Sequence, residues 1–371
     1  MRIKLNKNRI ALLIIFGGCI ILNIAAWLSK GFCDWYGANI QPILYNAFGR
    51  PISLLPFSLG EFMIMALIVI ILVTPISLLL LLIFLKGRRR LVLKIYGLVY
   101  IWILAFIVLT ETLNCFILYH RSTFGETYGI PTAEHTNAEL VELCDYLMVN
   151  TNDLAAQVQR DEDGKFILTA DLDETARSAM AALADEFPQL GGYYVTPKAI
   201  INSYFMSQQY LMGIYFPFSF EANYNEQMYP SNLPETVCHE LAHTKGFMLE
   251  DEANFIAFLA CDRCDNVEYK YSAYLRALKY VLSEVKDNCS DEDIDHVYSL
   301  MSRDVAVDIK GNSDYWKSVQ ESDEGLLPSK TVAAVSDAAM EASLKMNGVA
   351  DGKKSYGRMV DLMLNYGIGK K

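Results

Sequence analysis

The stretch PETVCHELAHTKGFMLEDEANF, residues 234–255, decides the fold of the second part of this chain. It places two of the five histidines, His239 and His243, four residues apart, with Glu240 directly after the first. Residues four apart on an α-helix differ by about 40° around its axis, so both imidazoles face the same way. Because that spacing lets two rings reach one cation, the stretch predicts a helix that carries part of a metal site.

The residues around the HExxH motif carry the signals of a helix with defined ends. Asn232 or Ser231 can cap the first turn, Pro234 suits the first helical position, and Glu235 complements the helix dipole. Gly246 is placed to end the helix. We therefore expect His239 and His243 on a short helix that stops soon after the second histidine.

Two histidines do not complete a catalytic zinc site, which usually has three protein ligands and one open position. A turn after Gly246 followed by a second helix places the acids of the next stretch beside the imidazoles. Glu250 is the expected third ligand, and Glu252 is the weaker alternative because it points elsewhere on that helix. Asn254 shares a face with Glu250, so we expect it to hydrogen-bond a ligand side chain.

Glu240 is the expected catalytic residue, because it lies beside the first histidine ligand. A carboxylate there can hold a water molecule and take its proton as that water attacks a carbonyl carbon. Cys238 is set aside as a ligand, because it precedes His239 directly and so projects about 100° away. The CDRC stretch, Cys261 to Cys264, is a lone CxxC and is interpreted as packing thiols or one local disulfide.

The first 120 residues have the composition of a membrane domain. Three segments, about 10–28, 62–85 and 91–118, are apolar over the roughly 20 residues that a spanning helix needs. Pro75 interrupts the second, which is tolerable in a transmembrane helix. The chain is 53% hydrophobic overall, and we place the excess in these spans. A cleaved signal peptide is the alternative interpretation of the first segment.

Charges indicate how the spans are oriented. Basic residues precede the first span and fill the KGRRR link at 86–90, so both places are expected in the cytoplasm. Residues 121–371 are then a separate domain outside the cytoplasm, and they carry 21 Lys/Arg against 40 Asp/Glu, a net charge of −19. Such an acidic domain excludes a nucleic-acid partner, because phosphates would be repelled. The expected partners are the lipid bilayer and a peptide or protein substrate.

The pattern of the second part predicts an α+β fold that is mostly helical. Helical spacing dominates 136–187 and most of the chain after 250, whereas 191–205 and 211–225 are rich in aromatic and β-branched residues and predict strands. The segment 212–220 is the candidate edge strand for binding a substrate backbone, with a plain core strand as the alternative. Tyr271 and Tyr274 are weighed as oxyanion donors, with helix packing favoured for both.

HExxH followed by ExxAN resembles the gluzincin metallopeptidases, in which the glutamate that opens the second motif is the third ligand; that glutamate corresponds to Glu250. Asn254 stands where thermolysin-like enzymes have Asp, and the gap from His243 to Glu250 is shorter than usual. The wider run, behind three N-terminal spans, is similar to the bacterial membrane family called domain of unknown function 3810. This resemblance implies a zincin-like fold and brings no established substrate.

These observations together predict a membrane-anchored zinc metallopeptidase, a hydrolase acting outside the cytoplasm. The alternative is a non-catalytic envelope sensor or scaffold in which zinc only stabilises the fold; a fourth protein ligand would favour it. An intramembrane protease is rejected, because the motif is too polar and too short for a span and lies more than 100 residues after the third one.

Overall fold

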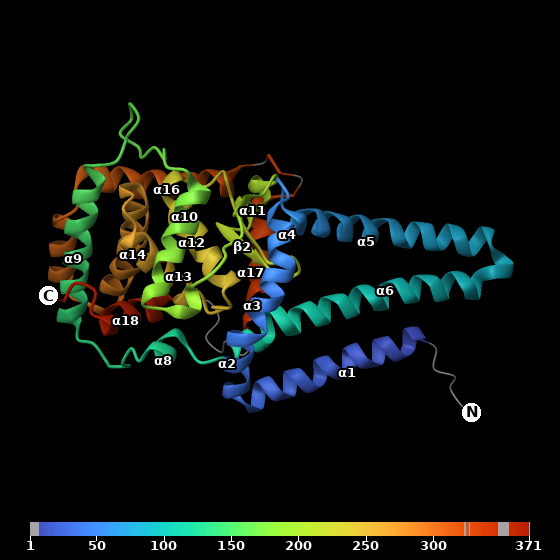
Figure 1. Cartoon of the computed structure of the whole chain (residues 1–371). Coiled ribbons are helices and arrows are strands. Elements are labelled where there is room, and N and C mark those ends of the chain that lie inside the picture. Colours follow the sequence, from blue (N-terminus) through green and yellow to red (C-terminus); the bar gives the residue numbers. More distant parts are fainter. Residues whose placement is uncertain (1–6, 323, 326, 348–355, 371) are drawn as a thin grey trace.

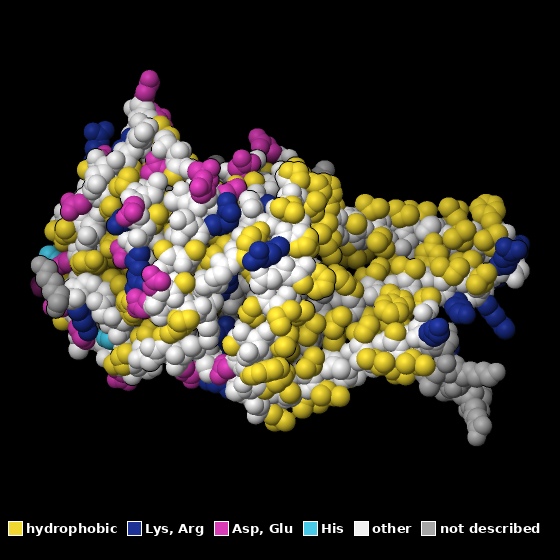
Figure 2. Space-filling view, viewed as in Figure 1, with side chains coloured by type: hydrophobic (Ala, Val, Ile, Leu, Met, Phe, Trp, Pro, Cys, Tyr) yellow, Lys and Arg dark blue, Asp and Glu magenta, His cyan; other side chains and the backbone are white. Residues whose placement is uncertain are grey.

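Three long apolar helices project from one side of the molecule in this computed structural model, which describes residues 7–322, 324–325, 327–347 and 356–370 (Figure 1). They are α1 (Lys7–Leu28), α5 (Leu59–Phe84) and α6 (Arg89–Glu111), the last continuing through the π-helix η3 (Thr112–Phe116) into α7 (Ile117–Tyr119). By length and composition all three could cross a membrane, consistent with the predicted spans. Hydrophobic side chains cover them, and Lys and Arg gather at their far ends (Figure 2).

The segment between α1 and α5 is helical and packs on the rest of the molecule. It contains α2 (Lys30–Asn39), α3 (Gln41–Leu44), the π-helix η1 (Tyr45–Gly49) and α4 (Arg50–Ser53). The buried Tyr45 hydroxyl accepts a hydrogen bond from the Val195 amide at 2.8 Å, and the Gln41 amide donates to the Thr244 carbonyl at 2.8 Å. This segment therefore joins the apolar helices to the globular part, by which we mean residues 121–370.

The globular part is mostly helical, as the sequence predicts, and its acidic side chains lie away from the apolar helices (Figure 2). Its helices are α8 (Phe124–Tyr128), α9 (Asn137–Ala155), α10 (Leu172–Ala182), α11 (Ser203–Gln208), α12 (Leu233–Thr244), α13 (Glu250–Arg263), α14 (Val267–Asn288), α15 (Asp291–Ser299), α16 (Arg303–Glu321), α17 (Ser329–Met346) and α18 (Tyr356–Tyr366). Every residue of α13 from Asp251 to Cys261 is buried, because α10, α12, α14 and α18 surround it.

One small sheet lies beside α12. Its strands are β1 (Lys198–Ala199), β2 (Gly213–Phe216) and β3 (Glu221–Tyr224), in the order β1-β3-β2. β3 pairs with β1 in parallel and with β2 in antiparallel, with Gly213 opposite Tyr224 and Phe216 opposite Glu221. β2 is thus an edge strand of this sheet, and both β2 and β3 pack against α12.

The predicted strands are longer than the observed ones. The expected strand over 191–205 keeps only β1, because the Asn202 side chain caps α11 by accepting a hydrogen bond from the Phe205 amide, so the chain turns helical. The expected edge strand over 212–220 ends at Phe216, since Pro217 has no amide hydrogen for the ladder and Phe220 adopts a positive φ of 57°. α16 forms over Arg303–Glu321, where the sequence pattern predicted no helix.

Two buried carboxylates attach the start of α5 to the sheet. Glu221 on β3 accepts hydrogen bonds from the Leu59 and Gly60 amides at 2.9 and 2.7 Å and pairs with the buried Lys198 ammonium at 2.7 Å. Glu61 in turn accepts from the amides of Ile201 and Asn202, both at 2.9 Å. Because these groups are out of water, each bond constrains the angle between α5 and the sheet.

Glu221→Ala is expected to lower the free energy of unfolding by about 3–5 kcal/mol, because it leaves Lys198 buried without its counter-charge and frees two amides. Thermal unfolding of the detergent-solubilised full chain measures the loss. Asp163→Ala is the control, since that side chain is 78% exposed in its pair with Lys165 and should not move the melting temperature measurably. Equal melting temperatures for both variants would contradict the structural role of Glu221.

Candidate metal centre

Helix α12 presents His239, Glu240 and His243, and its start differs in detail from the prediction. Asn232 occupies the N-cap position, but its side chain makes no cap and donates to the Asn312 side chain at 2.9 Å. The Glu235 amide is instead satisfied by the Ser272 hydroxyl of α14, at 3.1 Å. The predicted cap is therefore wrong, because a tertiary partner supplies the acceptor that a local side chain was expected to provide.

A tight turn after α12 brings the next helix back to the imidazoles. Gly246 has a φ of +84°, a left-handed conformation that favours glycine, and α13 begins four residues later at Glu250. Its first turn holds Glu250, Asp251 and Glu252. The predicted turn thus places the acids of α13 next to the end of α12.

Three side chains converge between these two helices. The Nε2 atoms of His239 and His243 lie 3.0 Å apart, and the carboxylate oxygens of Glu250 lie 3.2 Å from the first and 3.7 Å from the second. Two ligands of a tetrahedral zinc ion with bonds near 2.1 Å are about 3.4 Å apart. The donor atoms of His239, His243 and Glu250 therefore have the spacing and chemical type of a metal-ligand set.

The other nitrogen of each ring is already engaged. His243 Nδ1 lies 2.7 Å from the Phe247 carbonyl, which can only accept, so Nδ1 carries the proton. His239 Nδ1 lies 2.8 Å from Asn254 Oδ1, as expected for a residue that orients a ligand. If both rings are neutral, the two Nε2 lone pairs point at each other and at the Glu250 carboxylate. Because these groups repel one another, the arrangement needs a cation or a proton between them.

Electrostatics show how the site behaves without a metal. Burial alone would lower the pKa of His239, but the hydrogen bond and charge of Glu250 outweigh it and raise this pKa to about 9. Burial and the neighbouring His239 lower the pKa of His243 to about 4. Burial opposes ionisation of Glu250, yet its partners hold its pKa at about 2. At neutral pH a proton on His239 thus occupies the place a cation would take.

Glu240 is buried beside this cluster. Burial raises its pKa to about 8, although the charge of His239 opposes the shift. Its Oε2 atom has no hydrogen-bond partner among the described residues, while a backbone hydrogen bond connects the carboxylate to Tyr215 of β2. A carboxyl group with this pKa can exchange a proton near neutral pH.

Strand β2 approaches Glu240 closely. A Cβ added to Gly213 would lie 2.3 Å from Glu240 Oε1, so only glycine fits at this position. The ring of Tyr215, two residues on, lies 6.3 Å from the His243 ring. The edge strand therefore runs directly past Glu240 and the group of candidate ligands.

One known protein family matches the part of the chain that contains this site. The model of the family described as protein of unknown function (DUF3810) matches residues 36–364. The chain belongs to this family. No curated protein and no solved structure matches it. The matched residues include α5, α6 and the helices of the candidate metal centre. The apolar helices and the site of this DUF3810 protein therefore belong to the same family match.

The weaker ligand candidate, Glu252, points away from the cluster in this DUF3810 protein. Its carboxylate accepts a hydrogen bond from the Phe124 amide, and burial raises its pKa to about 8. Cys238 is also turned away, with its sulfur 3.7 Å from that of Cys261. Glu252 lies two positions after Glu250, so helical geometry sends it to a different face of α13.

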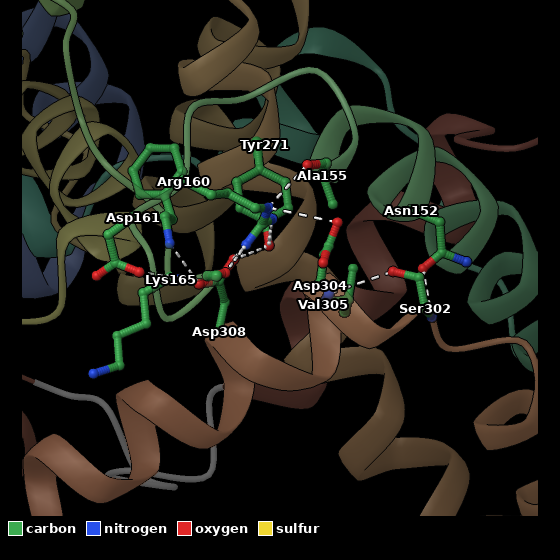
Figure 3. A network of polar contacts seen from close by, with 12 residues as sticks. Asn152, Ala155, Arg160, Asp161, Lys165, Tyr271, Ser302, Asp304, Val305 and Asp308 are labelled. Carbon is green, nitrogen blue, oxygen red and sulfur yellow. Dashed lines mark hydrogen bonds and ion pairs between the residues drawn. The ribbon is translucent and has the colours of Figure 1, made fainter.

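The two tyrosines weighed as oxyanion donors pack elsewhere. The Tyr271 hydroxyl donates to Asp308 at 2.5 Å in a buried network that also holds Arg160 (Figure 3). The Tyr274 hydroxyl donates to Asp262 at 2.8 Å. Both hydroxyls are used in helix packing, the alternative that the sequence analysis favoured.

Sequence reasoning missed three contributors to the site. The Phe247 carbonyl orients His243, and no side-chain pattern signals a backbone acceptor. The Tyr215 backbone makes a hydrogen bond to the Glu240 carboxylate, although the two residues are 25 positions apart in the sequence. Gly213 was the one detectable case, since a glycine inside a strand pattern indicates close approach of another group.

Asn254→Ala is expected to weaken zinc binding by roughly 10–100-fold, because it removes the acceptor that holds the His239 ring. Competition with a fluorescent chelator measures the affinity of the purified full chain. His296→Ala is the matched control, since this histidine is half exposed and pairs with Asp145 away from the cluster. An unchanged affinity in Asn254→Ala would show that the ring is positioned by other contacts.

Zinc affinity should rise with pH by about tenfold per unit between pH 5 and pH 8, because the cation must displace the proton of His239. The rise should level off above the pKa of about 9. His243 and Glu250 add no proton competition in this range, since their pKa values are about 4 and about 2. Calorimetry in buffers of different ionisation enthalpy counts the protons released; no release at pH 7 would contradict this picture.

Proposed function

We propose that this protein is a membrane-anchored zinc metallopeptidase with a zincin-like domain, hydrolysing peptide bonds outside the cytoplasm. The observation that carries the proposal is the convergence of His239, His243 and Glu250 with Glu240 beside them. A general base next to a set of three ligand groups is the arrangement of metal-assisted hydrolysis.

The ligand groups suit zinc in number and kind. Two imidazoles and one carboxylate are a common donor set of catalytic zinc sites, which keep a further position open. The Glu250 side chain is 42% exposed while His239 and His243 are mostly buried, so solvent reaches the cluster from the Glu250 side. A zinc ion held there would supply Lewis acidity to a water molecule and a peptide carbonyl.

Glu240 would move the proton. Its free Oε2 atom accepts a proton from water as that water attacks the carbonyl carbon, and the same carboxyl group gives the proton to the departing amine. The raised pKa, caused first by burial, suits both transfers near neutral pH.

Strand β2 would hold the substrate backbone. It is an edge strand of the described sheet, and it passes Glu240 at Gly213. A peptide that adds to a sheet edge gains main-chain hydrogen bonds without a demand on its side chains. A peptide paired with β2 would therefore lie across the metal centre in an extended conformation.

The apolar helices would anchor the domain in the cell membrane with the N-terminus in the cytoplasm. Lys86, Arg88, Arg89 and Arg90 lie at the link between α5 and α6, at the far end from the globular part. Basic links of this kind stay in the cytoplasm. The globular part and its metal centre then face the outside.

Glu240→Gln should retain zinc and lower kcat/KM for peptide cleavage by about 10²–10⁴-fold, because it removes the proton acceptor but leaves the three ligands. Digestion of an unbiased peptide library with the purified full chain, read by mass spectrometry, first identifies cleavable sequences. Glu292→Gln, an exposed carboxylate on α15, is the control and should cleave like the parent. If Glu240→Gln cleaves as fast as the parent, Glu240 does not have this role.

The alternative function is a zinc-stabilised sensor or scaffold without catalysis. It requires a closed coordination shell, and among the described residues the cluster contains three ligand groups with Glu250 partly exposed. Zinc bound with no cleavage of any library peptide would favour this alternative over the peptidase.

A further inference from the structure

A long apolar groove lies between α5 and α6, at the end of these helices that is next to the sheet. Its volume is about 690 Å³, within the range of sites that bind small ligands. Side chains from Met63 to Ile70 on α5 and from Leu98 to Ile107 on α6 form its walls. Phe216 of β2 and Phe218 of the β2–β3 connection form the end nearest the sheet. Figure 1 shows the two helices joined at the far end and separating toward the sheet.

Two hydrogen bonds join α5 and α6 near the end of the groove farthest from the sheet. The Tyr100 hydroxyl donates to Thr74 Oγ1 at 2.7 Å, and the Tyr96 hydroxyl donates to Ser77 Oγ at 2.8 Å. These bonds add to the packing that holds the two helices together. The wall residues on α6 reach Leu98, past the Tyr100 bond, and stop before Tyr96.

The walls give the groove a definite length. The walls run from position 63 to 70 on α5 and from 98 to 107 on α6, which at about 1.5 Å per residue is about 10–14 Å along the helices, roughly half of a 30 Å hydrocarbon core. A spanning helix must continue through the other half, where the walls of this groove do not extend. A hydrocarbon chain from the outer leaflet ends within this depth, so the dimensions favour an acyl chain over a helix.

The upper end of the groove is continuous with the edge strand. Phe216 packs so closely on the start of α5 that a Cβ on Gly60 would lie 2.4 Å from its ring, and Gly213 lies against Glu240. Phe216 is three positions after Gly213 on the strand, a distance of about 10 Å. One strand thus connects the mouth of the apolar groove to the candidate metal centre.

We propose that the groove holds the acyl chain of a lipid-anchored peptide, and that such peptides are the substrates of this protein. This inference rests on the proposed peptidase function. A peptide paired antiparallel to β2, the more stable pairing, has its N-terminal side at Phe216 and its C-terminal side toward Gly213 and Glu240. The acyl chain is therefore attached at the N-terminal end of the peptide.

The test compares three forms of one cleavable peptide with the full chain in lipid nanodiscs. The forms carry an N-terminal palmitoyl group, an N-terminal acetyl group, or an N-terminal apolar helix of spanning length. Ala66→Trp and Val99→Trp each fill the groove from a side chain exposed on its wall. Leu72→Trp is the matched control, because Leu72 is 65% exposed on α5 outside the groove.

We expect the parent and Leu72→Trp to prefer the palmitoyl over the acetyl form, and the groove-filling variants to lower that ratio on the order of tenfold. Membrane confinement is the same in all variants, so the change reports packing in the groove. An equal ratio in all four proteins, or a preference for the helix-anchored form that Ala66→Trp removes, would overturn the inference.

A binding experiment separates failure of the inference from failure of the proposed function. A palmitoyl peptide with a photoreactive group on its chain should cross-link Glu240→Gln within 63–70 or 98–107, and excess palmitoyl peptide should compete. Labelling spread over α1, or labelling equally displaced by bilayer phospholipid, would contradict the assigned occupant. Specific labelling without cleavage of any peptide would overturn the peptidase and leave the groove assignment standing, whereas cleavage without groove labelling would do the reverse.

Discussion

The orientation of two imidazole rings is the constraint on which the candidate site depends. Each ring gives its Nδ1 proton to a fixed oxygen, Phe247 O for His243 and Asn254 Oδ1 for His239. The Nε2 atoms are thereby aimed at one point, 3.0 Å apart, with the Glu250 carboxylate on the third side. Without these two acceptors either ring could rotate, and the donor atoms would not converge.

Burial of the two motif helices maintains this orientation. α12 and α13 lie at the centre of the globular part, and nearly all of their side chains are out of solvent. Ionisable groups in such a place acquire shifted pKa values, as Glu240 does at about 8 and His239 at about 9. The packing that holds the rings therefore also sets their protonation, so geometry and acid–base behaviour share one cause.

Features of the fold and the candidate site were predictable where residues close together in the sequence determine them. The HExxH spacing predicts that His239 and His243 face one way, because helical periodicity is local, and Gly246 similarly predicts the turn to Glu250. The apolar helices were predictable from composition alone. The Asn232 cap was wrong because Ser272 on a distant helix took its role, and the Glu221–Lys198 pair depends on strand pairing that no pattern specifies. Features set by tertiary contacts were thus the ones that sequence reasoning missed.

The attachment of α5 to β3 through Glu221 has a geometric consequence for any membrane-bound substrate. If α5 spans a bilayer, as its length and composition allow, these bonds fix the tilt of the sheet relative to the membrane, and Glu240 keeps a constant distance from the end of α5. In the proposed peptidase, the number of residues between the membrane and the cleaved bond would then be the same for every substrate, whatever their side chains.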